Sequence, residues 1–151
     1  MFDGKIVKMP FIPHKYKKWI EIVIGGTMKQ IKFTKEHEWV KIDNEHVYVG
    51  ITDFAQKQLG DVVFIQLPDI GLDFKIGEEV AVIESVKAAS EIYAPVSGRI
   101  IEVNEILNDS PDIINSDAEE NGWIWKMSLS DFSQLDNLMD KSEYSSFVSE
   151  D

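Results

Sequence analysis

Short apolar stretches, separated by turn residues, recur along most of the chain. Two of them, residues 38–42 and 46–51, flank Asp43-Asn44-Glu45 and predict a β-hairpin. Further strands are expected where Val, Ile and aromatic residues are concentrated, at residues 61–67, 79–85, 91–94, 98–103 and 122–129. The pattern therefore predicts a mostly β protein with short strands.

A short helix is expected after the first hairpin. Thr52 or Asp53 can open it, and Gly60 stands where a glycine would end it. Gln56 follows Asp53 by three residues, which resembles the spacing of a capping box.

The last part of the chain changes from strand to helix periodicity. Ser130 and Asp140 are the expected N-caps, and Glu143 follows Asp140 at capping-box spacing. Apolar residues then recur at helical spacing, at Phe132, Leu135, Leu138 and Met139 and again at Tyr144, Phe147 and Val148. We expect both apolar stripes to pack onto the sheet.

Composition fits one folded domain and excludes several kinds of chemistry. The 151 residues are 44% hydrophobic, enough to form a core. The chain has no cysteine, which excludes disulfides, thiol nucleophiles and thiolate metal sites. A net charge of −12 opposes binding to a phosphate backbone, so no nucleic-acid partner is expected. No apolar run approaches the roughly 18 residues of a membrane span, so no membrane partner is expected either.

The charge divides the chain into two unequal parts. Residues 1–27 hold five lysines and two acids, for a net charge of +3, whereas residues 28–151 have a net charge of −15. The leading segment fits a targeting peptide, an additional strand at residues 19–24, or an upstream extension that precedes a natural start at Met28. It lacks Arg and Ser, and Glu21 interrupts its apolar run, which disfavours a targeting peptide. We favour the extension and assign the functional domain to residues 28–151.

Lys87 lies between two predicted strands and is the only basic residue between Lys75 and Arg99. Small neighbours such as Ser85 and Ala88 leave its side chain unshielded. An exposed lysine is a poor nucleophile by itself, but another enzyme could modify it. An amide bond to a carboxylic acid would remove its charge and lengthen the side chain. On spacing alone, a plain surface lysine explains this position better.

Several ordered motifs around Lys87 resemble the glycine cleavage H-protein family of lipoyl carriers. The resemblance covers about residues 33–148. It rests on TKEHEWV at residues 34–40, VGITDFAQ at 49–56, LGDVVF at 59–64, LP at 67–68, ESVKAAS at 84–90, APVSG at 94–98 and NGW at 121–123. Motifs in this order and at this spacing are far more specific than one lysine on a hairpin.

The resemblance implies a barrel-sandwich hybrid, similar to lipoyl domains, with antiparallel strands and C-terminal helices. It also implies that lipoate is attached to Lys87 by a lipoate-attaching enzyme, which would recognise the neighbouring residues Glu84, Ser85, Val86 and Ala88. The chain would then be a carrier and not an enzyme. Its arm would take the aminomethyl group of glycine from glycine decarboxylase to an aminomethyltransferase, and dihydrolipoyl dehydrogenase would reoxidise the dithiol.

The resemblance further implies a cleft into which the loaded arm folds, where limited water access would slow hydrolysis. Glu38 matches an acid of the family within the His-Glu-Trp motif. Glu91 stands where relatives often have Asp, and Gln58 where some relatives have His. Solvated strand surface is the alternative explanation for Glu38 and Glu91.

Other interpretations remain open at this stage. Biotinyl domains usually flank their lysine with methionines, where this chain has Val86 and Ala88. Lipoyl domains of 2-oxoacid dehydrogenases usually have Asp before the lysine and lack the flanking segments found here. An H-like protein that relays lipoyl groups or serves another redox pathway, and an unmodified β-sandwich interaction module, are further alternatives. No nucleophile, metal-ligand or phosphate-loop motif indicates an enzyme. We expect a bacterial cytoplasmic protein and not one of the mitochondrial matrix.

Overall fold

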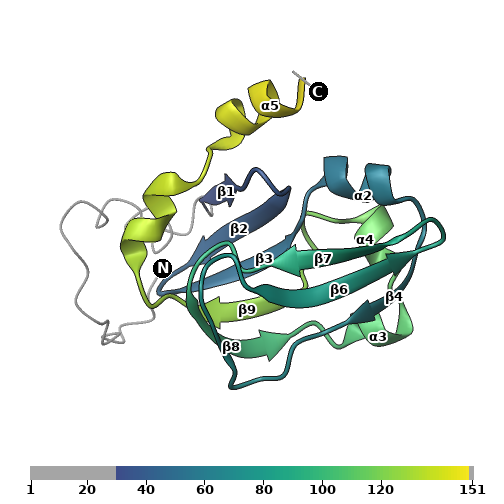
Figure 1. Ribbon diagram of the computed structural model, residues 1–151, viewed down its shortest axis with the longest axis horizontal. Coiled ribbons are helices and arrows are strands. Elements are labelled where there is room, and N and C mark those ends of the chain that lie inside the picture. Colours follow the sequence, from purple (N-terminus) through teal and green to yellow (C-terminus); the bar gives the residue numbers. More distant parts are fainter. Residues whose placement is uncertain (1–29, 150–151) are drawn as a thin grey trace, which may run out of the picture.

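The computed structural model of the protein describes residues 30–149. Two unclosed antiparallel sheets with a few short helices confirm the predicted mostly β fold with C-terminal helices (Figure 1). The extension expected at residues 1–27 and the strand considered at residues 19–24 lie outside the described residues.

The larger sheet has six strands and includes the predicted hairpin. In spatial order its strands are β1 (Ile31–Phe33), β2 (Glu38–Asp43), β3 (His46–Ile51), β9 (Trp125–Ser128), β8 (Gly98–Val103) and β5 (Asp73–Phe74). Strands β2 and β3 join at Asn44, whose φ of 60° is a left-handed conformation that Asn tolerates in turns. Strand β9 is shorter than the predicted strand 122–129, because the N–H of Gly122 closes a turn onto the carbonyl of Asp117.

The smaller sheet has three strands and carries the hairpin that contains Lys87. Its order is β4 (Val62–Gln66), β6 (Glu79–Ser85) and β7 (Ala89–Tyr93). Strand β7 begins at Ala89, earlier than the predicted strand 91–94, because a backbone hydrogen bond of 2.8 Å from Ser85 to Ala88 closes a tight turn.

Three short helices gather at one end of the sheets (Figure 1). They are α2 (Asp53–Leu59), α3 (Ile106–Asp109) and α4 (Ile113–Ser116). Helix α2 is the predicted one: the Thr52 hydroxyl caps it by accepting a hydrogen bond from the Ala55 N–H, and Gly60 ends it at a φ of 76°. The Gln56 side chain donates to the Asp53 carboxylate, so these two residues do not complete a capping box.

The C-terminal segment forms η2 (Phe132–Asn137), a 3₁₀ helix, and then α5 (Lys141–Ser149). Asp131, and not Ser130, caps η2, since its carboxylate accepts from the Ser133 N–H at 2.9 Å. The capping box before α5 forms as predicted: the Asp140 N–H donates to Glu143 at 3.0 Å, and the Glu143 N–H donates to Asp140 at 2.8 Å.

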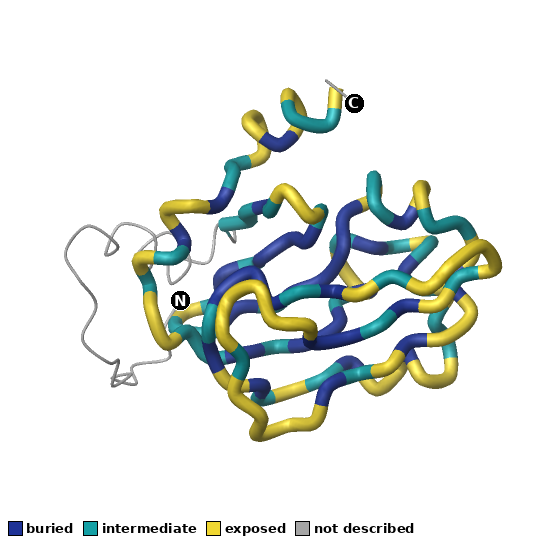
Figure 2. Tube along the Cα trace, viewed as in Figure 1, coloured by how far each residue is buried: buried dark blue, intermediate teal, exposed yellow. Residues whose placement is uncertain are grey.

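Both C-terminal apolar stripes contribute to packing, as expected. Leu135 and Leu138 join the main core between the sheets, whose buried strand residues form the dark interior of Figure 2. Tyr144 joins a second cluster, in which its ring stacks on that of Phe33 at 4.5 Å and Trp39 is fully buried. Helix α5 is thereby held against the start of the larger sheet.

Strands β8 and β9 approach so closely at Gly98 that no side chain fits there. A Cβ at this position would lie 1.6 Å from the carbonyl oxygen of Ser128. Relief would require moving backbone and not merely turning a side chain, so the ladder between these two strands depends on this glycine.

We predict that Gly98→Ala lowers the free energy of unfolding by about 3 kcal/mol, because β9 must shift to admit the methyl group. Gly71→Ala is the control, since its Cβ would meet nothing within 4 Å. Its left-handed backbone, at a φ of 96°, strains alanine, so a smaller loss of about 1 kcal/mol is still expected. Urea denaturation measures both variants, and equal losses would contradict the importance of this close approach.

Candidate functional site

Lys87 lies at the tip of the hairpin between β6 and β7, where the sequence pattern predicts it. Ser85 shapes this tip with its side chain as well as its backbone. The Ser85 hydroxyl accepts from the N–H groups of Lys87 and Ala88, both at 3.1 Å, and donates to the Ala88 carbonyl at 3.1 Å. The turn is therefore rigid although the residues from Val86 to Ala89 are exposed.

The other residues expected to form the attachment motif surround this turn. Glu84 is exposed and lies opposite Ala89, with which it forms the last residue pair between β6 and β7. Val86 is 67% exposed, which is unusual for a valine, and its N–H donates to the carbonyl of Asp61 at 3.0 Å. An enzyme that binds this hairpin would meet an apolar tip with one acid beside the lysine.

The lysine side chain is exposed but runs along one neighbouring segment of backbone. It passes close to Gly60, the residue that ends α2: a Cβ on Gly60 would lie 3.3 Å from Cε of Lys87 and 3.8 Å from its Nζ. Glycine at this position therefore leaves room for the lysine stem. The hairpin tip thus lies against the connection between α2 and β4.

A cleft of about 430 Å³ opens beside this hairpin. It is lined by residues of the β1–β2 loop, β3, α2 and β7: Glu36, His37, Ile51, Phe54, Ala55, Gln58, Leu59 and Ser90. Leu59 directly precedes Gly60, and Ser90 follows Lys87 by three residues, so one end of the cleft lies near the base of the lysine hairpin.

Of the three residues expected in an arm-docking cleft, Gln58 lines this cleft and the other two lie elsewhere. Glu91 is exposed on β7, opposite Val82. Glu38 is only 2% exposed; its carboxylate accepts from the Thr34 hydroxyl at 2.7 Å and from the Tyr93 N–H at 3.2 Å. Solvated surface therefore describes Glu91 but not Glu38.

Burial raises the pKa of Glu38, and its hydrogen bonds from Thr34 and Tyr93 offset part of this shift. Because Glu38 belongs to β2 and Tyr93 to β7, the carboxylate links the two sheets beside the cleft. Glu38 thus fixes the position of β7, the strand that supplies Ser90 to the cleft.

Most of the cleft lining was not predicted from the sequence. His37 has a left-handed φ of 69°, and its Nδ1 lies 2.8 Å from the hydroxyl of Tyr144. That hydroxyl also lies 2.7 Å from the hydroxyl of Thr52, the cap of α2. Helix α5 therefore supports both His37 and the start of α2, over a sequence separation that no local pattern reveals.

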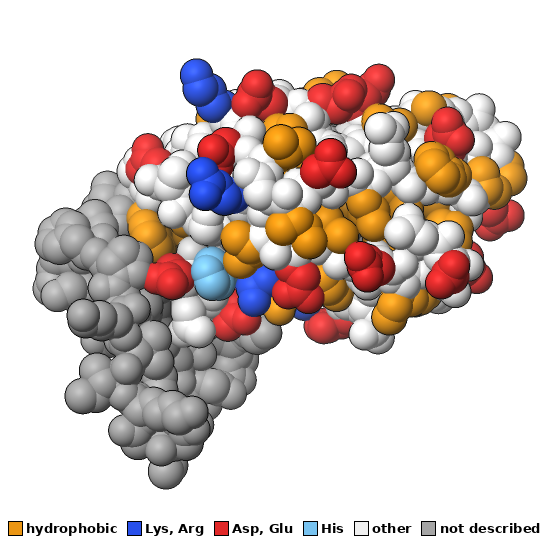
Figure 3. All heavy atoms as spheres, turned by 90° about the horizontal axis from the view of Figure 1, so that it is seen from below, with side chains coloured by type: hydrophobic (Ala, Val, Ile, Leu, Met, Phe, Trp, Pro, Cys, Tyr) orange, Lys and Arg blue, Asp and Glu red, His pale blue; other side chains and the backbone are white. Residues whose placement is uncertain are grey.

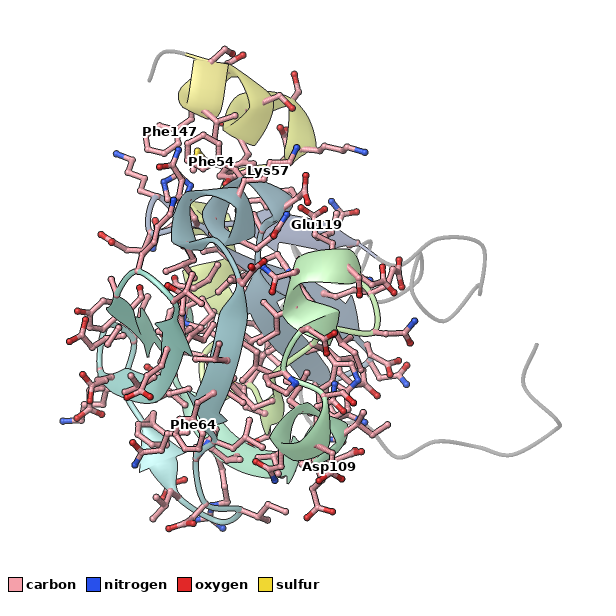
Figure 4. All side chains as sticks on the ribbon, turned by 90° about the vertical axis from the view of Figure 1, so that its right-hand side faces the viewer. Phe54, Lys57, Phe64, Asp109, Glu119 and Phe147 are labelled. Carbon is pink, nitrogen blue, oxygen red and sulfur yellow. The ribbon has the colours of Figure 1, made fainter. Side chains whose placement is uncertain are left out.

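Aromatic rings from two helices pack on His37. Its ring centroid lies 4.8 Å from that of Phe54 on α2 and 5.8 Å from that of Phe147 on α5. Figure 4 shows Phe54 and Phe147 together where these two helices meet. A signal for the α2 wall was present in the sequence, because Phe54 and Gln58 are four residues apart and so lie on one face of the predicted helix.

Acidic side chains are common on the surface of the described residues. Figure 3, seen from below Figure 1, shows many acidic and few basic side chains on that face, with apolar side chains between them. Glu91 and, more weakly, Glu79 raise the pKa of the Tyr93 hydroxyl on β7. Such a surface favours encounters with basic partner surfaces.

Residues 30–149 contain neither a group of side chains that could hold a metal ion nor a membrane-spanning helix. No group of three or more His, Asp or Glu side chains there is arranged to hold a metal ion. None of the helices described there is long and apolar enough to cross a membrane.

Comparisons with known proteins identify relatives over most of the chain. The model of the family described as Glycine cleavage H-protein matches residues 31–151. The Glycine cleavage system H protein of Parvibaculum lavamentivorans is 53% identical over 121 residues, which cover 80% of this chain and 97% of the relative. That of Thermotoga maritima is 52% identical over 124 residues, covering 82% of this chain and 100% of the relative.

A solved structure agrees with these sequence relatives. The crystal structure of a glycine cleavage system H protein from Mycobacterium marinum has a TM-score of 0.74 to this structure at 35% sequence identity. The match covers 80% of this chain and 97% of that chain. The likeness is thus supported by sequence as well as by shape.

We predict that the wild type loses stability relative to Glu38→Gln as the pH rises. The loss begins near pH 4.5, the ordinary pKa of a glutamate, and is complete above the raised pKa of Glu38 in the folded protein. The folded chain binds this proton more tightly than the unfolded chain does. The resulting stabilisation is fully present at low pH and disappears as the carboxyl group ionises. Urea denaturation at a series of pH values measures the difference; parallel curves for the two proteins would contradict a raised pKa.

Proposed function

The chain belongs to the glycine cleavage H-protein family, and we propose that Lys87 is the residue to which its lipoate is attached. The protein is a lipoyl carrier of the glycine cleavage system and is not itself an enzyme. The observation that supports Lys87 is its position at the exposed tip of a rigid four-residue turn, where an attaching enzyme can reach the amine. Glu84, Ser85, Val86 and Ala88 are the proposed recognition residues.

The cleft of about 430 Å³ is the proposed resting place of the loaded arm. The lipoyl group supplies the dithiol chemistry, and residues of this chain present and shield it. Ile51, Phe54 and Leu59 provide an apolar lining, and Gln58 adds an amide that can hydrogen-bond to the arm. A lined cleft of this kind limits the access of water to a hydrolysable group.

For Glu38 and Glu91 we propose supporting parts in arm docking. Glu38 holds β7 in place through the Tyr93 N–H, and β7 carries both Ser90 and Glu91. Glu91 adds negative charge near the hairpin, which attracts a cationic aminomethyl group. Neither carboxylate has to line the cleft in order to act in this way.

The proposed partners follow from membership of a multienzyme system. They are glycine decarboxylase, the aminomethyltransferase, dihydrolipoyl dehydrogenase and a lipoate-attaching enzyme. We further propose that residues 28–151 form the carrier domain, which is consistent with the family match to residues 31–151. The bacterial sources of the relatives support a location in the bacterial cytoplasm.

We expect incubation with a lipoate-attaching enzyme to add the mass of one lipoyl group to the wild type and nothing to Lys87→Arg. Arginine keeps the charge of the side chain but does not form the amide. Lys57→Arg is the matched control, because Lys57 is a 72% exposed lysine on α2, the helix that ends at Gly60. Intact-mass spectrometry measures the added mass on all three proteins. Addition of a lipoyl group to Lys87→Arg would disprove Lys87 as the attachment site.

We also expect the lipoylated wild type to support exchange between the carboxyl group of glycine and bicarbonate when glycine decarboxylase is present. Unmodified protein and Lys87→Arg should show only the background rate of the decarboxylase. Lipoylated protein that fails in this assay would instead favour the relay of lipoyl groups or another redox pathway.

A further inference from the structure

Asn115 in α4 binds the connection between α2 and β4 with every part of its side-chain amide. Its Oδ1 accepts a hydrogen bond from the Val62 N–H at 2.9 Å. Its Nδ2 donates to Oε1 of Gln56 at 3.0 Å and to the carbonyl of Gly60 at 2.9 Å. One half-buried side chain thus joins the last turn of α2 to the first residue of β4.

The lysine hairpin rests on the same connection. The carbonyl of Asp61, between two residues that Asn115 holds, accepts the Val86 N–H at 3.0 Å. The stem of Lys87 passes over Gly60, as its distance of 3.3 Å from a Cβ at that position shows. Displacement of this connection would therefore move or release the hairpin tip.

The connection also continues directly into the wall of the cleft. Gln58 and Leu59, the last residues of α2, line the cleft, and Gln56 belongs to the same short helix. Asn115 therefore contacts the one segment that joins the cleft wall to the support of the lysine. Figure 1 shows α4 beside α2 at this end of the molecule, and the two helices are in contact.

We propose that Asn115 is a positioning residue for the lipoyl-lysine arm: it fixes residues 60–62 and thereby sets the place of Lys87 relative to the cleft. The inference rests on the proposed attachment at Lys87. Asn suits this task because its amide offers an acceptor and two donors within one plane. Alanine would leave three backbone or side-chain groups without their partner.

The test compares Asn115→Ala and Asn115→Asp with the wild type and with Asn108→Ala. Aspartate keeps the acceptor for the Val62 N–H but cannot donate to Gln56 or Gly60, so its effect should be intermediate. Asn108 is an exposed residue of α3, another four-residue helix, which makes it a matched control.

Two measurements are made on each variant: amide hydrogen exchange in the unmodified chain, and the kinetics of lipoate attachment. In Asn115→Ala we expect exchange at Val62 and Val86 to rise by about tenfold, with core amides such as Val49 unchanged. We expect kcat/KM for attachment to fall by about fivefold with kcat largely retained, because the attaching enzyme meets the correct hairpin less often. Asn108→Ala should change neither measurement.

Three results would overturn the proposal. Exchange at Val86 could remain at the wild-type rate in Asn115→Ala. Exchange could rise equally at Val49, which would show general destabilisation; if Asn115→Ala does not fold, Asn115→Asp decides by the same criterion. Attachment could also proceed unchanged despite faster exchange at Val86. Absence of lipoate on wild-type Lys87 would refute the proposed attachment site instead, and the exchange data would still report whether Asn115 holds the hairpin.

Discussion

The hydrogen bond from the Val86 N–H to the Asp61 carbonyl joins the two parts on which a carrier depends, the hairpin that presents the lysine and the helix that forms the cleft wall. A two-stranded hairpin tip is marginally stable in water without further contacts. Here Ser85 orders the turn internally, and Asp61 holds it from outside. The proposed lipoyl arm could therefore be long and mobile while its attachment point stays fixed, which would keep its effective concentration high at the sites it must reach.

A second constraint is electrostatic and comes from Glu38. Burying a carboxylate is costly unless its oxygens are hydrogen-bonded. Thr34 and the backbone of Tyr93 satisfy one oxygen each, which explains why a residue that reads as surface in the sequence is tolerated in the interior. Since Glu38 lies on β2 of the larger sheet and Tyr93 on β7 of the smaller sheet, the cost of burial is offset by a link between the two sheets next to the cleft.

Sequence patterns predicted the structure correctly where it depends on a few neighbouring residues. The hairpin at Asn44, the end of α2 at Gly60 and the capping box before α5 were all predictable, because each depends on a few neighbouring residues. Helices α3 and α4 were missed, since four residues give no helical period to detect. The cleft could be predicted only in part: His37 and Tyr144 meet across 107 residues, and only the tertiary fold brings them together.

The attachment that we propose at Lys87 requires the enzyme to distinguish this lysine from other exposed lysines by the surroundings of its side chain. Lys57 is also exposed, but it lies on a helix and pairs with Asp53 at 3.0 Å, so its amine is already engaged in an ion pair. Lys87 instead follows an exposed valine on a turn with small neighbours, and the nearby backbone of Gly60 has no side chain to obstruct its stem. An attaching enzyme can therefore select one lysine by enclosing a rigid tip. The hydrogen bonds of Asn115 to the connection beneath this tip would, in our proposal, also determine where the lipoyl arm can reach.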